Sequence, residues 1–146
     1  MTSHTPGATA RIHGHPIHTL LAPVPFVCFV GTLITDIVYA RTAEMQWANF
    51  SMWMLTVGLL VSVLVVIAGL IDFLANRGLR RRRATWIHGV GDGLALLLAI
   101  INAFVHTRDA YTSVVPEGLI LSALVVIILV AVGWNDRNMT PVEERP

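Results

Sequence analysis

The sequence predicts an all-α integral membrane protein, folded as an antiparallel four-helix bundle. Of its 146 residues, 55% are hydrophobic and only 13% are charged, and the mean hydropathy is +0.69. A soluble domain carries about 25% charged residues, so this chain lacks the charge to cover a water-facing surface. Its uncharged runs include Val24–Thr35, Phe50–Ile71 and Gly118–Trp134. Runs of about 20 apolar residues match a hydrocarbon core of about 30 Å.

Hydropathy places four spans at about 17–40, 50–74, 85–106 and 114–134. Pro16 suits the first turn of a helix, whereas Pro23 and Pro25 each remove a backbone donor. We therefore expect residues 15–22 to form a short leading turn before a main helix that begins near Pro25. The leader is rich in histidine rather than basic, and no small-residue cleavage site follows, so the first span is expected to be retained.

The second and fourth spans are almost free of polar groups. Asp72 ends the second span, on a face that carries the residues Gly58, Val65, Ala68 and Gly69. This seam of mostly small residues predicts that the carboxylate points into the bundle. In the fourth span Ser122 is the only clearly polar residue between Leu119 and Val132. The fourth span is therefore expected to form the least polar wall of the bundle.

The third span carries its polar residues along one stripe. They are His88, Asp92, Asn102 and His106. At roughly 100° per residue, all four lie within about 40° of one line, and Ala95 and Ala99 occupy the same line between them. We expect this stripe to face the bundle interior, because an ionisable group inside a membrane is costly unless it is paired.

Glycines lie beside this stripe at its first turns. Gly89 and Gly93 are four residues apart, which is the spacing that lets a second helix backbone approach closely. Gly91 adds to the same region. The glycines would also leave room for a flat ligand, so the pattern does not exclude binding, but close packing is the more frequent meaning of such a pair and is what we expect here.

The arginines predict the orientation in the membrane. Eight arginines fall on one side of a four-span chain, namely Arg11, Arg77, Arg80, Arg81, Arg82, Arg83, Arg137 and Arg145. Only Arg41 and Arg108 fall on the other. The positive-inside rule then places both termini and the arginine-rich loop in the cytoplasm. We expect a multi-pass protein of a cytoplasmic membrane, with a cytoplasmic leader (1–14), a transmembrane domain (15–134) and a cytoplasmic tail (135–146).

The composition also excludes several classes of function. A net charge of +1 gives no basic surface suited to nucleic acid, so the lipid bilayer is the expected partner. A single cysteine, Cys28, allows neither an intramolecular disulfide nor a cysteine zinc cluster. The sequence contains no nucleophile–base pair, phosphate loop or metalloprotease motif, so it does not indicate an enzyme.

The polar residues of the spans fall into two groups by depth. The cytoplasmic group comprises His15, His18, Asp72, His88 and Asp92, and the outer group comprises Asp36, Asn102 and His106. Polar residues inside a membrane mark functional sites by default. The cytoplasmic group is richer and draws on three helices, so we place the candidate site there.

Several short motifs occur in an order that resembles a known family. They are His15-Pro16, Pro25, Asp36, Gly69-x-x-Asp72, and an arginine followed by His88. In order and spacing the chain resembles the domain-of-unknown-function 2231 family from about His15 to Trp134. The resemblance implies a four-span bacterial membrane protein and no assigned activity. Some relatives carry Rieske-type or cytochrome c-type domains, which implies a redox neighbourhood and a redox partner protein.

Three functions remain open for the cytoplasmic group. Haem b could be held by two histidines, with His15 or His18 opposite His88. A divalent metal or proton site could use histidine with carboxylate, Asp92 orienting His88. The polar residues could instead hold together a structural subunit, a partner scaffold or a homo-oligomer. We expect His15 and Asp72 to approach His88, with His18 as the alternative to His15.

Overall fold

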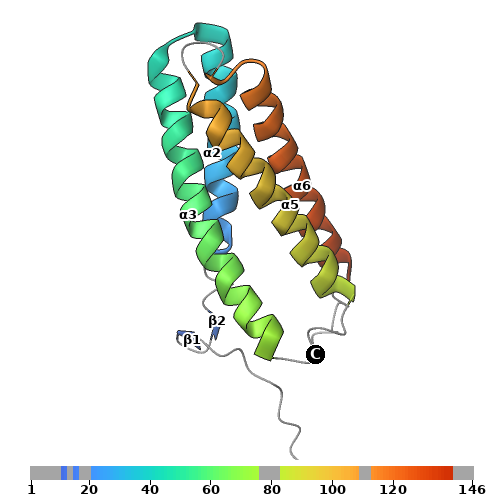
Figure 1. Cartoon of the computed structure of the whole chain (residues 1–146). Coiled ribbons are helices and arrows are strands. Elements are labelled where there is room, and N and C mark those ends of the chain that lie inside the picture. Colours follow the sequence, from blue (N-terminus) through green and yellow to red (C-terminus); the bar gives the residue numbers. More distant parts are fainter. Residues whose placement is uncertain (1–10, 13–14, 17–20, 76–82, 109–112, 140–146) are drawn as a thin grey trace, which may run out of the picture.

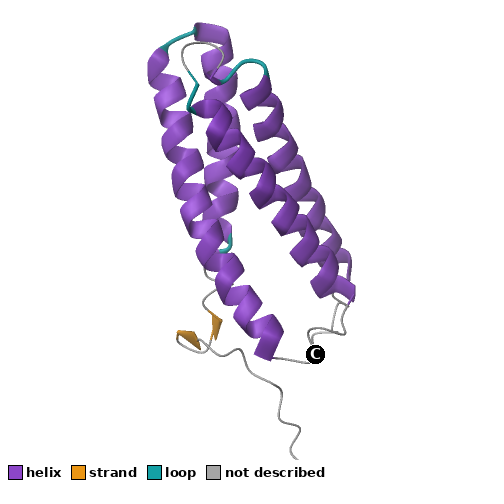
Figure 2. Cartoon of the chain, in the orientation of Figure 1, coloured by secondary structure: helices purple, strands orange, loops and turns teal. Residues whose placement is uncertain are grey.

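A computed structural model describes residues 11–12, 15–16, 21–75, 83–108 and 113–139 of the chain. Within these ranges it contains four long helices and one pair of two-residue strands (Figures 1 and 2). The helices are α2 (Pro23–Thr42), α3 (Met45–Ala75), α5 (Arg83–His106) and α6 (Glu117–Met139). Each of the four is long and apolar enough to cross a membrane. The predicted all-α, four-span architecture is therefore confirmed.

The helices form two hairpins that pack side by side (Figure 1). Helix α2 packs against α3 and α6, and α5 packs against α6 and α3, so the four helices form a closed ring. The turns from α2 to α3 and from α5 to α6 lie at the same end, which we name the hairpin end. The opposite end, where α3 ends at Ala75 and α5 begins at Arg83, is named the arginine-loop end.

The first helix begins earlier than the proline pattern predicted. Helix α2 starts at Pro23 rather than near Pro25, because a proline in the first turn loses no helical hydrogen bond. Before it, strand β1 (Arg11–Ile12) pairs antiparallel with β2 (His15–Pro16), so the start of the expected leading turn is a strand. Residues 17–20 lie outside the described ranges.

The connection from α2 to α3 is only two residues long. Ala43 adopts a left-handed conformation with φ of 55°, and its backbone N–H donates to the Tyr39 carbonyl over 2.8 Å. This conformation is unfavourable for a residue with a Cβ atom, and it ends the helix in the way that glycine usually does. The short turn extends α3 back to Met45, five residues before the expected start of the second span.

Two apolar layers form the core. The larger layer, termed the middle layer, contains Phe29, Leu55, Ala95, Ala99 and Val125. The smaller layer, termed the hairpin layer, contains Tyr39, Ala48 and Val114. The alanines of the α5 stripe are thus fully buried, as expected of residues on the inward face.

The close approach of α5 to a neighbour occurs at a different glycine from the predicted pair. A Cβ atom added at Gly89 or Gly93 would meet nothing within 4 Å, so the expectation of close packing there was wrong. A Cβ atom at Gly91 would instead collide with the side chain of Val132 on α6. The spacing of Gly89 and Gly93 predicted that their face of α5 packs against another helix. In the structure, α6 lies instead against the side of α5 that carries Gly91.

Candidate functional site

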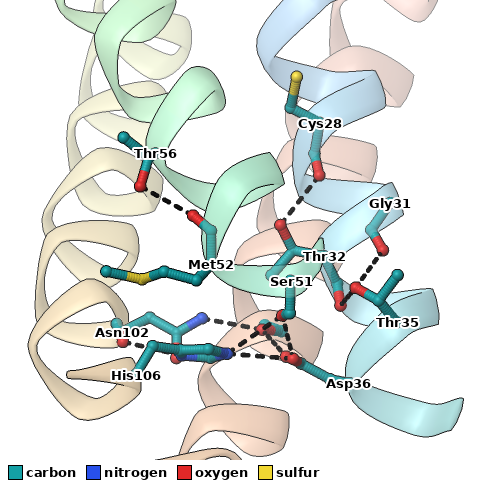
Figure 3. Close-up of polar contacts among 11 residues, drawn as sticks. Cys28, Gly31, Thr32, Thr35, Asp36, Ser51, Met52, Thr56, Asn102 and His106 are labelled. Atoms are coloured by element: carbon teal, nitrogen blue, oxygen red, sulfur yellow. Dashed lines mark hydrogen bonds and ion pairs between the residues drawn. The ribbon is translucent and has the colours of Figure 1, made fainter. Parts of the chain in front are cut away.

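A cluster of polar side chains from all four helices lies between the two apolar layers. Asp36 comes from α2, Ser51 from α3, and Asn102 and His106 from α5 (Figure 3). Ser122 of α6 completes the set, which we call the polar layer. All five residues are buried, and Asp36 is 0% exposed.

The Asp36 carboxylate is the centre of the polar layer. Its Oδ1 atom accepts a hydrogen bond from the Ser51 hydroxyl and lies 3.0 Å from His106 Nε2. Its Oδ2 atom accepts a hydrogen bond of 2.5 Å from the Ser122 hydroxyl. One carboxylate of α2 thereby contacts each of the other three helices. These contacts fix the rotation and height of the helices relative to one another, because a buried acceptor without its donors is costly.

The remaining polar atoms extend this network. The Asn102 side-chain amide donates to the Ser122 hydroxyl over 2.8 Å, and His106 Nδ1 lies 3.0 Å from the backbone carbonyl of Asn102. Ser51 Oγ also lies 3.2 Å from His106 Nε2. Asn102 Oδ1 is buried and has no hydrogen-bond partner. The network is therefore complete except at this one oxygen.

Gly118 makes room for the His106 ring. A Cβ atom at Gly118 would lie 2.9 Å from His106 Cε1 and 3.1 Å from the Ser113 carbonyl oxygen. The first contact is too short for a real Cβ atom, and the second is unusually tight and involves backbone that cannot easily move. The first turn of α6 thus holds the ring of His106 in place by close contact.

The other end of the α5 stripe lines a cavity of about 180 Å³ at the arginine-loop end. His88 Nδ1 lies 3.2 Å from Asp92 Oδ2 one turn along the same helix, and these side chains are 47% and 39% exposed. The other lining side chains are mostly apolar and come from every helix, among them Pro25, Phe26, Phe29, Ser62, Val65 and Leu129. We call this space the His88 cavity.

The structure describes some of the predicted site residues and not others. Asn102 and His106 point into the bundle as predicted, whereas His88 and Asp92 line a cavity and stay half-exposed. Asp72 is buried, at 8% exposure, in agreement with its predicted inward direction. His15 lies in β2, where only the backbone is described, and His18 lies outside the described residues. Their approach to His88 stays a prediction.

Two members of the polar layer were not identified from the sequence as site residues. Ser51 and Ser122 lie in nearly uniform apolar runs, where a hydroxyl usually bonds to its own helix backbone. Thr32 and Thr56 do so here, donating to the carbonyls of Cys28 and Met52 (Figure 3). The signal that could have identified them is their depth in the membrane, because both serines lie at the same depth as Asp36 and His106.

Among the described residues, no group of three or more His, Cys, Asp or Glu side chains is placed to hold a metal ion. The pairs Asp36–His106 and His88–Asp92 each supply two such side chains. Each pair is therefore short of a metal-binding set by at least one side chain.

Four spanning helices around a buried polar layer define a multi-pass membrane protein of the four-helix-bundle class. The family comparison agrees with this class: a family model described as "Predicted membrane protein (DUF2231)" matches residues 14–140. The chain belongs to this family, which confirms the resemblance found in the sequence. Searches of curated proteins and of solved structures found no match.

Proposed function

We propose that the protein is a membrane-embedded binding module whose site is the His88 cavity. The observation that supports this is a cavity lined by all four helices, mostly apolar, with His88, Asp92 and Ser62 as its polar groups. Binding sites for small molecules are typically apolar, with a few placed polar groups that orient the ligand. Such a site suits a lipophilic ligand that reaches the protein through the bilayer.

The histidine has the setting of a coordinating or hydrogen-bonding group. Asp92 lies within hydrogen-bonding distance of His88 Nδ1. A carboxylate that accepts from one ring nitrogen fixes the tautomer of a histidine and raises its basicity towards a ligand. Asp92 is thus a positioning residue for His88 in this proposal.

The volume of the cavity selects the size of the ligand. A dry cavity of about 150 Å³ holds a benzene ring, and the His88 cavity measures about 180 Å³. A ring-sized group fits in this conformation, whereas a whole haem b needs the two hairpins to separate further at the arginine-loop end. We therefore propose a planar ring-sized ligand or headgroup, and treat haem b as one outcome of the test.

A structural role is the second candidate, and the polar layer favours it. Asp36 joins α2 to the other three helices, which is what a subunit that scaffolds a partner or forms a homo-oligomer needs to keep its shape. Under this proposal the His88 cavity stays empty in the purified protein. The two candidates therefore differ in whether a ligand copurifies.

We also propose that the arginine-loop end faces the cytoplasm of a bacterium. Five arginines at the arginine-loop end support this orientation, Arg77 and Arg80–Arg82 between α3 and α5 and Arg83 at the start of α5. Single cysteines introduced at Arg81 and at Thr112 in a Cys28→Ser background would test it with a membrane-impermeant thiol reagent on intact cells. Labelling at 112 but not at 81 is expected, and the reverse pattern would overturn the orientation.

The binding proposal is tested on the purified protein. An oxidised and reduced visible spectrum, a metal analysis and mass spectrometry of an organic extract would be recorded for the wild type, His88→Ala and Ser62→Phe. We expect a bound molecule, coloured or colourless, in the wild type and its loss in both variants, because one removes the polar group and the other fills the cavity.

Phe104→Ala provides a matched control, because Phe104 is 71% exposed on the outer face of α5. It should retain the ligand. A Soret band that disappears in His88→Ala would identify the ligand as haem b. A colourless wild-type preparation whose extract contains no stoichiometric small molecule would overturn the binding proposal and leave the structural role.

A further inference from the structure

The polar layer is enclosed on both sides by apolar side chains. The middle layer, with Phe29, Leu55 and Val125, separates it from the arginine-loop end. The hairpin layer, with Tyr39 and Val114, separates it from the hairpin end. The polar layer is therefore an occluded compartment within the bundle, distinct from the partly open His88 cavity.

The hydrogen bonds fix the tautomer of His106. Its Nδ1 atom lies 3.0 Å from the Asn102 backbone carbonyl, and a carbonyl oxygen can only accept. Nδ1 therefore carries a hydrogen and donates it. This leaves Nε2, which faces Asp36 Oδ1 across 3.0 Å, as the ring atom whose protonation varies.

The hydroxyl groups of Ser51 and Ser122 are the other hydrogen-bond donors to the Asp36 carboxylate. Ser51 donates to Oδ1 and Ser122 donates to Oδ2, so neither serine hydrogen is available to fill the gap between Oδ1 and Nε2. Without a further hydrogen, two lone pairs would face each other at 3.0 Å. The layer would also carry a net negative charge inside the membrane, which is costly.

We propose that Asp36 and His106 together bind a single proton, which makes the polar layer an occluded, electroneutral proton-binding site. The proton lies between His106 Nε2 and Asp36 Oδ1, either on the ring, giving an imidazolium–carboxylate pair, or on the carboxyl group. Both arrangements have the same total charge and the same partners. The proposal concerns the pair and does not depend on which atom holds the proton.

No other charged group that the structure describes faces this pair. The partners from α3 and α6 are the hydroxyls of Ser51 and Ser122, and the nearest titratable residue in the hairpin layer is Tyr39. Arg108 and Glu117 pair with each other at the surface, where both are more than half exposed. The charge of the polar layer is thus set by Asp36 and His106.

The unpartnered Asn102 Oδ1 indicates the side from which the proton exchanges. Asn102 and Ser122 line a narrow pocket whose other walls include Phe29, Thr32, Leu55 and Val125. Phe29 also lines the His88 cavity, so its ring separates the two spaces. This narrow space does not admit a water molecule in the described conformation, so exchange through it requires the Phe29 ring to move. Because Asn102 Oδ1 is a buried acceptor without a hydrogen-bond partner on this side of the polar layer, we infer that exchange runs past Phe29, between the polar layer and the His88 cavity.

Two spectroscopic signals, measured on the full-length protein, determine how many protons Asp36 and His106 bind. Nitrogen-15 NMR of labelled histidine reports protonation of His106 Nδ1 and Nε2, assigned by the loss of signals in His106→Gln. Infrared absorption reports a protonated carboxyl at Asp36, assigned by its loss in Asp36→Asn. We expect a protonated Nδ1, together with a proton on either Nε2 or the carboxyl group. An unprotonated Nδ1, two protons on the pair, or none would overturn the proposal.

Asp36→Asn adds a second readout that a purely structural role would not produce. It should leave His106 neutral, with the hydrogen on Nδ1 only, and a doubly protonated ring would contradict the proposal. Ser122→Ala is a milder variant should Asp36→Asn fail to fold. It removes one hydrogen bond to Oδ2 and should retain the shared proton, and loss of that proton would count against a site made by Asp36 and His106.

The route past Phe29 is tested by the rate at which the nitrogen-bound hydrogens of the His106 ring exchange with deuterated solvent. Phe29→Ala should accelerate this exchange at least tenfold, and Phe104→Ala on the outer face of α5 should leave it unchanged. Equal rates in the wild type and both variants would overturn the route. The protonation count is independent of the ligand test at His88, so each proposal can fail alone.

Discussion

Helix α5 carries a histidine–aspartate pair at each end of the bundle, in opposite settings. At the hairpin end His106 meets Asp36 of another helix, and the side chains are 1% and 0% exposed. At the arginine-loop end His88 meets Asp92 of its own helix, and they are 47% and 39% exposed. A pair that joins two helices fixes how they pack, whereas a pair within one helix leaves the neighbouring helices free to form a cavity.

The packing around the two histidine–aspartate pairs also differs: it is tight around Asp36 and His106 and open around His88 and Asp92. Gly118 brings the first turn of α6 against His106, and the Ser51 and Ser122 hydroxyls enclose Asp36. At the other end, His88 and Asp92 line a cavity of about 180 Å³. The hairpin end is thus tightly packed, and the arginine-loop end retains space inside the bundle.

The largest expected effect comes from removing the central carboxylate. Asp36→Ala leaves a buried histidine and two buried hydroxyls without their acceptor, and losing one partner of a buried pair costs about 3–5 kcal/mol. The matched variant Asp92→Ala removes a half-exposed partner from one helix and should cost about 0.5 kcal/mol or less. Unfolding in detergent followed by circular dichroism measures both. Similar losses would show that the two pairs are equivalent.

The second effect concerns the space beside His106. Gly118→Ala should lower the free energy of unfolding by about 1–3 kcal/mol, because an added Cβ atom overpacks the ring and the Ser113 carbonyl. Gly133→Ala on the same helix places its Cβ atom in open space. It should gain up to about 1 kcal/mol from helix propensity. Stabilisation by Gly118→Ala would contradict the close packing of His106.

The third effect separates the two kinds of glycine on α5. Gly91→Ala should destabilise the protein by about 1–2 kcal/mol through collision with Val132 on α6. Gly93→Ala should be neutral or stabilising, since nothing lies within 4 Å of its added Cβ atom. Thermal unfolding of the two variants side by side is sufficient. The reverse order would restore Gly89 and Gly93 as the packing face.

The smallest effect is expected from a surface ion pair at the hairpin end. Arg108 Nη1 lies 2.7 Å from Glu117 Oε2, with both side chains more than half exposed. Glu117→Gln should therefore cost at most about 1 kcal/mol, and the cost should shrink as salt is added. Unfolding at low and high ionic strength measures this. A salt-independent cost of several kcal/mol would mean that surface charge contributes to the rigidity of the hairpin end.

Hydropathy predicted the fold well because each span is a long run that only a membrane helix explains. The phase of α5 was also predictable, since His88, Asp92, Asn102 and His106 mark one face of an otherwise apolar helix. The partners were harder to predict. Ser51 and Ser122 stand in mostly apolar runs, so periodicity gives little indication of the direction in which they point.

From the sequence, the candidate site was placed at the arginine-loop end, on residues of different helices. Helical periodicity predicts which face of each helix points inward, but it does not predict which residues of different helices are in contact. Counting ionisable groups favoured that end, but it could not tell a tight network from an open cavity, because this depends on how the hairpins pack. Gly91 shows the same limit: spacing gave the glycine face of α5, and only the position of Val132 on α6 selects the residue in contact.

The most direct test of the difference between the two ends is a pair of double-mutant cycles on the free energy of unfolding. One cycle combines Asp36→Asn with His106→Gln, and the other combines Asp92→Asn with His88→Gln. We expect a coupling energy of about 2–3 kcal/mol for the enclosed pair and below about 0.5 kcal/mol for the half-exposed pair. Equal coupling energies, or a larger one for His88 and Asp92, would contradict the account of a rigid hairpin end and an open arginine-loop end.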